Sequence, residues 1–191
     1  AVLAYRDALT AAIDAEAATV PQSATLLASC EHFHSRLCSP ASILRLREYL
    51  QRWTDEFLVI VYFRRQDRAA ISHYSTRLKS GNPSPGAFPS LTEGALPYYY
   101  DYQSVYANWA EVFGAGNLSP ALYDPGSWVR GDLLEDFCSR AGLSSANKTR
   151  PRRQINRSVD ERGARLLMEL NRQWRRSPGR TLSREAVAAL I

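Results

Sequence analysis

The sequence predicts a single α/β domain with a short, mainly parallel sheet and helices on both faces of that sheet. Residues 57–63 form a continuous apolar run, FLVIVYF, whose β-branched and aromatic content is typical of a strand buried between two layers of helices. An amphipathic pattern follows directly, with Ile71, Tyr74 and Leu78 at helical spacing. The length of 191 residues, with 45% hydrophobic and 23% charged residues, fits one globular domain over 1–191.

Proline and glycine residues set the bounds of the expected helices. Pro21 stops an N-terminal helical pattern, and Pro40 suits the first turn of the helix that crosses over into the central strand. Gly81 and Gly142 follow the last periodic residues of two further helices. The expected helices span 2–20, 40–53, 69–81, 102–113, 131–142 and a stretch that begins after 158.

Two further short strands are expected beside the central one. The apolar run over 24–29 precedes a cluster of titratable residues, and a second run over 118–123 contains Pro120, which places that strand near an edge of the sheet. In a parallel sheet the carboxyl ends of the strands meet at one edge. Polar residues that follow the strands are therefore expected to gather there.

The central strand ends in a charged corner, Arg64-Arg65-Gln66-Asp67-Arg68, that leads into a helix. Free N–H groups and the positive dipole end of a helix, placed beside arginines beyond the carboxyl end of a strand, favour binding of an anion such as phosphate, sulfate or carboxylate. The alternative is that Arg64 and Arg65 form ordinary ion pairs with surface acids.

The string RRQDRAAIS, with Arg64 and Ser72 eight residues apart, resembles the 3′-phosphate-binding segment of sulfotransferases that use 3′-phosphoadenosine-5′-phosphosulfate. YFRRQDRAAISHYSTRLKSG, YDYQSVYANWAEVFG and GDLLEDFCSRAGL are similar to a bacterial branch of this family associated with cell-surface glycans, from about Ala24 onward. The resemblance implies a P-loop NTPase-like fold and metal-free transfer of a sulfuryl group to a carbohydrate or glycolipid hydroxyl, as in polysaccharide biosynthesis. It implies that Arg64 and Ser72 hold the donor's 3′-phosphate.

The family's loop for the 5′-phosphosulfate group is not found in the sequence. That loop follows the first strand and binds the group with backbone N–H groups and a lysine, but no GxxxxGK[ST], PKSGT or KTGT-like string occurs. The sequence also does not begin with Met. We therefore expect that the segment carrying the loop is missing, and that the chain as written binds the donor but transfers poorly.

The cluster Cys30-Glu31-His32-Phe33-His34 offers candidates for a general base, because sulfuryl transfer to a hydroxyl requires removal of a proton. The resemblance places the base after the strand that precedes the 3′-phosphate strand and favours Glu31, followed by His32 and His34. The alternative is a surface carboxylate at a helix start with two surface or core histidines. No zinc site is expected, since the spacing matches no known ligand pattern.

Two other stretches suggest ligand contacts. Tyr98, Tyr99, Tyr100 and Tyr102 could form a wall for a sugar acceptor. The helical spacing of Tyr102, Val105, Trp109 and Phe113 instead favours packing of a helix onto the core. Thirteen of the 24 Lys and Arg residues lie between 140 and 184. The resemblance implies that a late basic loop covers the donor nucleotide, whereas a solvated basic face is the alternative. The candidates for this contact are Arg150, Arg152 and Arg153.

Composition limits the location and partners of the protein. Three cysteines without a CxxC pair fit a reducing, cytoplasmic compartment, and no apolar run approaches the ~18 residues of a membrane helix. The expected partners are the nucleotide donor and a glycan acceptor, with no nucleic acid. The competing hypotheses are a P-loop kinase-like phosphotransferase that uses ATP and Mg²⁺, a nucleic-acid-binding module, and a non-catalytic protein that binds nucleotides or polyanions.

Overall fold

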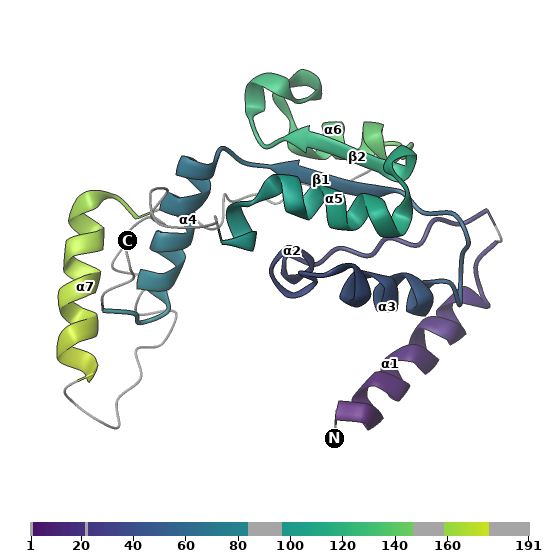
Figure 1. Ribbon diagram of the computed structural model, residues 1–191, viewed down its shortest axis with the longest axis horizontal. Helices are drawn as coiled ribbons and strands as arrows, with labels where there is room; N and C mark the ends of the chain where they lie inside the picture. Colours follow the sequence, from purple (N-terminus) through teal and green to yellow (C-terminus); the bar gives the residue numbers. More distant parts are fainter. Residues whose placement is uncertain (1, 22, 84–96, 147–158, 176–191) are drawn as a thin grey trace.

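The computed structural model describes residues 2–21, 23–83, 97–146 and 159–175, which form a mixed α/β fold around a two-stranded parallel sheet (Figure 1). The helices and strands are α1 (Val2–Ala17), α2 (His32–Arg36), α3 (Pro40–Leu50), β1 (Val59–Phe63), α4 (Gln66–Lys79), the 3₁₀ helix η1 (Tyr98–Tyr100), α5 (Tyr102–Phe113), η2 (Ala115–Asn117), β2 (Leu118–Leu122), η3 (Pro125–Ser127), η4 (Val129–Gly131), α6 (Leu133–Arg140) and α7 (Glu161–Arg175).

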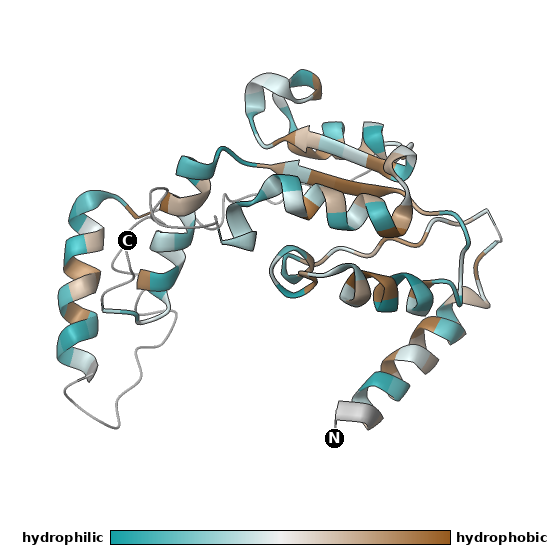
Figure 2. Cartoon of the chain, in the orientation of Figure 1, coloured by the Kyte–Doolittle hydropathy of each residue, from teal (hydrophilic) through white to brown (hydrophobic). Residues whose placement is uncertain are grey.

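The sheet confirms two of the three expected strands and their parallel direction. β1 pairs with β2 from Val59 opposite Leu118 to Phe63 opposite Leu122. All five residues of β1 are partly buried, so this strand is less enclosed than its apolar sequence predicts. Figure 2 shows that hydrophobic residues are concentrated along β1, whereas they alternate with hydrophilic ones along α7.

Helices cover both faces of the sheet, as the sequence predicts. On one face, Val59 packs against the buried cluster of Ile43 from α3 and Phe113 from α5. On the other face, the Tyr62 hydroxyl donates a hydrogen bond of 2.7 Å to Asp136 of α6. Because alternate side chains of a strand point to opposite faces, β1 connects both helical layers.

The expected strand over 24–29 is wrong. This segment has no strand pairing, and the side chains of Leu26 and Leu27 are 46% and 59% exposed. The only ladder described in the structure joins β1 to β2, so the backbone of 24–29 has no strand partner among the described residues. A short apolar run gives a strand only where another strand edge accepts its backbone hydrogen bonds.

The expected helices are present, but α1 and α3 end three residues earlier than expected, at Ala17 and Leu50. Ser39 caps α3 through its side chain, with Pro40 in the first turn. Gly114 and Gly142, with φ values of 84° and 65°, follow α5 and α6 in the left-handed conformation that glycine adopts without strain. Among the described residues, no helix has the length and apolar character needed to cross a bilayer.

The last described helix packs against α4 and forms a second small core. Leu78 of α4 and Leu167 of α7 are 0% and 1% exposed and lie in one buried cluster. The side-chain amide of Asn171, itself 3% exposed, donates hydrogen bonds of 2.8 and 3.1 Å to the backbone carbonyls of Leu78 and Asn82. The contact therefore combines apolar burial with satisfied polar groups.

We expect Leu167→Ala to lower the free energy of unfolding by about 3 kcal/mol, because a fully buried leucine leaves a cavity when it is truncated. The neighbouring residue Leu166 is 47% exposed and provides a matched control. Leu166→Ala should change the free energy by less than about 1 kcal/mol. Urea unfolding followed by circular dichroism measures both, and equal effects would contradict the packing of α7 on α4.

Candidate functional site

The carboxyl ends of β1 and β2 meet at one edge of the sheet. Phe63 lies opposite Leu122, and the backbone N–H of Tyr123 donates to the Phe63 carbonyl at 2.8 Å, which extends the ladder by one residue. The guanidinium carbon of Arg64 lies 5.6 Å from the centre of the Tyr123 ring. This edge therefore presents a cation next to an aromatic ring, in front of the start of α4.

The two arginines of the charged corner have different surroundings. Arg65 is 77% exposed and forms an ion pair with Asp67 at 3.0 Å. Arg64 is partly buried, and no ion pair involves its guanidinium in the described part of the chain. The ordinary ion-pair interpretation thus applies to Arg65, while Arg64 remains the cation available to an anion.

The other residues expected around the donor are only partly described. Ser72 lies in the second turn of α4 and is partly buried, and its backbone carbonyl accepts a hydrogen bond of 3.0 Å from the Thr76 hydroxyl. No described contact joins Ser72 to Arg64, so the binding of one phosphate by both residues remains a prediction. The basic loop residues lie outside the described residues: Arg150, Arg152 and Arg153.

Next to this edge, the Tyr99 ring stacks against two imidazoles from different helices. Its centre lies 4.6 Å from that of His34 in α2 and 5.1 Å from that of His73 in α4, with interplanar angles of 20° and 28°. We call these three residues the Tyr99 stack. One tyrosine ring can contact both helices because an aromatic ring can pack against more than one neighbouring ring.

Two neighbouring tyrosines connect the Tyr99 stack to the sheet and to α4. The Tyr100 hydroxyl lies 3.1 Å from Nδ1 of His73, and burial raises the pKa of Tyr100. The Tyr102 ring lies 4.7 Å from the ring of Phe63, the last residue of β1, and 6.3 Å from that of His34. Tyr100 has the expected packing role, since it is 7% exposed in a core cluster, whereas Tyr98, Tyr99 and Tyr102 are partly buried.

The three candidates for the general base differ in their environment. The side chain of Glu31 is 90% exposed and lies 4.0 Å from that of His32, which is itself 62% exposed. His34 is partly buried, its Nε2 atom has no hydrogen-bond partner in the described residues, and burial lowers its pKa. Among the three, only His34 is partly buried and packs against tyrosines beside the sheet edge.

A polar network fixes α6 to the other face of the sheet. The Asp136 carboxylate, 2% exposed, accepts hydrogen bonds of 2.7 Å from both Tyr62 and Arg140, and Arg140 also donates to the Ser119 hydroxyl at 3.3 Å. The Arg140 hydrogen bond, followed by that of Tyr62, lowers the pKa of Asp136. Burial, followed by the hydrogen bond to Asp136, raises the pKa of Tyr62 to about 12.

Asp136→Asn should destabilise the protein at pH 7, because an amide cannot pair with the Arg140 guanidinium as a carboxylate does. A lowered folded-state pKa means that the stabilisation is complete above the ordinary value of 3.8 and is lost as the pH falls through the folded-state pKa. The stability difference between wild type and variant, measured by urea unfolding, should therefore shrink between pH 7 and pH 3. Tyr62→Phe, which keeps the ion pair, should cost less; a pH-independent difference would contradict this role.

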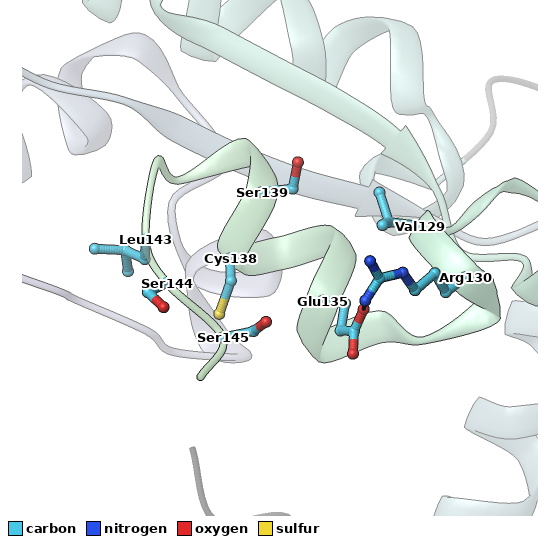
Figure 3. Close-up of a pocket in the computed structure, with 8 residues that line it drawn as sticks. All are labelled: Val129, Arg130, Glu135, Cys138, Ser139, Leu143, Ser144 and Ser145. Carbon is cyan, nitrogen blue, oxygen red and sulfur yellow. Dashed lines mark hydrogen bonds and ion pairs between the residues drawn. The ribbon is translucent and has the colours of Figure 1, made fainter. Parts of the chain in front are cut away.

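Two open cavities adjoin this network. One, of about 320 Å³, lies around the end of β2 and is lined by Phe63, Pro120, Ala121, Leu122, Ser127 and Arg140. The other, of about 330 Å³, lies along α6 (Figure 3), where Arg130 points toward Glu135 and pairs with it at 3.2 Å. The buried thiol of Cys138 lies at the second cavity.

Several contacts at this edge and on the other face of the sheet were not indicated by the sequence. His73 and Tyr99 are 26 residues apart and belong to different elements, so no local spacing links them. Tyr123 contacts Arg64 from across the strand pair, which becomes visible only once the register of β1 and β2 is known. In the sequence, Asp136 has the pattern of a polar residue on the exposed side of an amphipathic helix. Only the fold shows that it is buried.

Comparison with known proteins gives little guidance to function. No protein-family model matches the chain, and no solved structure matches it. An uncharacterized protein of Archaeoglobus fulgidus is 25% identical over 136 residues, which cover 71% of this chain and 36% of that protein. The chain thus spans about a third of the length of this relative, whose name states no activity.

Proposed function

We propose that this chain forms the donor-binding part of a sulfotransferase with a P-loop NTPase-like fold. The proposed donor is 3′-phosphoadenosine-5′-phosphosulfate, and the acceptor is a hydroxyl of a carbohydrate or glycolipid. The observation that carries the proposal is Arg64, which follows a parallel strand, precedes a 14-residue helix and has no ion-pair partner in the described residues. The resemblance of RRQDRAAIS to a 3′-phosphate-binding segment supports a 3′-phosphate as the ligand of this cation.

The residues at this edge suit the donor in charge and shape. Arg64 would bind the 3′-phosphate with its planar guanidinium, which forms paired hydrogen bonds to phosphate oxygens. Ser72 would add a hydroxyl from α4, the helix that follows Arg64. The ring of Tyr123, beside Arg64, limits the directions in which the guanidinium can point. A cation in this position would distinguish a nucleotide that carries a 3′-phosphate from one that does not.

We assign the proton-accepting role to His34. The donor supplies the sulfuryl group: a bond forms from the acceptor oxygen to sulfur, and the bond from sulfur to the bridging phosphate oxygen breaks and leaves its electron pair on the phosphate. The proton of the acceptor hydroxyl then requires a neutral base. His34 fits because burial lowers its pKa and because Tyr102 connects it to the end of β1.

Calorimetric titration with adenosine 3′,5′-bisphosphate and with adenosine 5′-monophosphate tests the proposal, because these ligands differ only in the 3′-phosphate. We expect tighter binding of the bisphosphate, without Mg²⁺. Equal affinities would contradict a 3′-phosphate site. Tighter binding of ATP with Mg²⁺ would instead support a kinase-like phosphotransferase. Binding of any polyanion, with affinity that falls steeply with salt, would support a non-catalytic polyanion-binding protein.

A further inference from the structure

The Tyr99 stack joins elements that are far apart in the sequence. His34 belongs to the five-residue helix α2, which has no buried residue, whereas His73 belongs to the 14-residue helix α4, which contributes four buried residues. α2 also contacts α5 through the rings of Phe33 and Trp109, whose centres lie 6.4 Å apart. A helix this short depends on tertiary contacts for its position, and the stack is one of the contacts that hold α2.

The groups that face the two imidazoles are aromatic or basic. On His73 they are Arg77 of the same helix, the Tyr100 hydroxyl and the Tyr99 ring. On His34 they are the rings of Tyr99 and Tyr102 from η1 and α5, together with the backbone of Tyr99. The titratable neighbours of His34 along the chain are exposed: Glu31, His32 and Arg36. No carboxylate in the described residues pairs with either stacked imidazole.

We propose that His73, acting through Tyr99, positions His34, and that protonation of the two imidazoles opens the stack and releases α2. The closed stack accommodates neutral rings, since it buries each imidazole without supplying a carboxylate that would stabilise its charge. Two positive rings on one tyrosine, with Arg77 beside one of them, would also repel each other. The positioning role of His73 rests on the proposed function only in naming His34 as the base.

The direction of the pH effect follows from the two burial-lowered pKa values. A group whose pKa is lowered in the closed state takes up its proton more readily in the open state, so acid favours opening. The closed state is therefore fully favoured above pH 6.5, the ordinary pKa of histidine. Its population decreases as the pH falls below that value. If opening takes up two protons, the equilibrium constant between the open and closed states rises by up to about 100-fold for each pH unit that the pH is lowered. If it takes up one proton, the rise is about tenfold.

NMR titration of the histidine side chains between pH 8 and pH 4.5 tests this proposal in the complete chain. The protein has three histidines, and the exposed His32 is the internal control. The C–H resonances of His34 and His73 should lie upfield at pH 8, because both rings stack on Tyr99. We expect both to lose this shift together, within one pH range, as the stack opens. His32→Gln assigns the third signal and should leave the other two unchanged.

His73→Phe separates positioning from simple packing. The phenyl ring can stack on Tyr99 but takes up no proton, so His34 should lose its upfield shift at lower pH and less steeply, with one proton in place of two. An unchanged or raised midpoint in this variant would overturn the proposal. Two results on the wild type alone would also overturn the proposal. One is that the upfield shifts persist when the histidines are protonated, and the other is that the two histidines change in separate transitions. None of these readouts uses a nucleotide, so they stand apart from the donor-binding test.

Discussion

His34→Gln is expected to lower turnover by about 100-fold or more while the affinity for the donor stays nearly unchanged. General-base catalysis contributes about 10²- to 10⁴-fold, and glutamine keeps the size and polarity of the side chain but cannot accept a proton. Because burial lowers the pKa of His34, wild-type turnover should stay high below the ordinary value of 6.5 and fall only in more acidic solution. The measurement is steady-state sulfuryl transfer by a form of the protein that includes a phosphosulfate-binding loop.

Two neighbours of His34 provide matched controls. Glu31→Gln and His32→Gln change titratable groups of the same segment that are 90% and 62% exposed. The family resemblance favours Glu31 as the base, whereas the described environment favours His34. If Glu31→Gln suppresses turnover and His34→Gln does not, the assignment to His34 is wrong. Unchanged turnover in all three variants would remove the whole cluster from the mechanism.

Arg64→Ala is expected to weaken binding of adenosine 3′,5′-bisphosphate by about 10- to 100-fold, since a hydrogen bond to a charged group contributes about 1.5–3 kcal/mol. Binding of adenosine 5′-monophosphate should change little, because that ligand has no 3′-phosphate for the guanidinium to bind. The preference for the bisphosphate should therefore disappear. Calorimetric titration of wild type and variant with both nucleotides measures this directly.

Arg65→Ala is the matched control for Arg64. Both arginines belong to the corner between β1 and α4, but Arg65 is 77% exposed and already pairs with Asp67. We expect its replacement to alter the affinity for either nucleotide by less than about threefold, as for the loss of a general positive charge screened by water. Equal losses in the two variants would indicate a diffuse electrostatic effect and would contradict a 3′-phosphate site at Arg64.

The sequence predicts the parts of the fold that depend on local signals. Pro40 marks the start of α3, and Gly81 and Gly142 follow the ends of α4 and α6, because these residues act on the backbone within a few positions. β1 is recognisable as a long apolar run. The apolar run over 24–29 gives the same kind of signal but forms no strand, because a strand also requires an edge to pair with, and the local sequence does not show whether one is present.

The candidate site is predictable only in part for a similar reason. Arg64 is indicated by its place between a strand and a helix, which is local information. The Tyr99 stack depends on three segments whose contacts are set by tertiary packing. The difference between the exposed Glu31 and the partly buried His34 depends on which side of α2 faces the tyrosines, and a five-residue helix has too few turns to show an amphipathic pattern.

Pro120 decides on which side the sheet can grow. The Tyr123 N–H points toward β1, so by the two-residue period of a strand the backbone nitrogen of Pro120 faces the outer edge of β2. Proline has no N–H, and the row of donors along that edge is interrupted at its middle. A further strand therefore cannot add to β2 with a complete ladder, which protects this edge from pairing with other chains. Regular extension of the sheet would then occur at the other edge of β1, which pairs with no strand among the described residues.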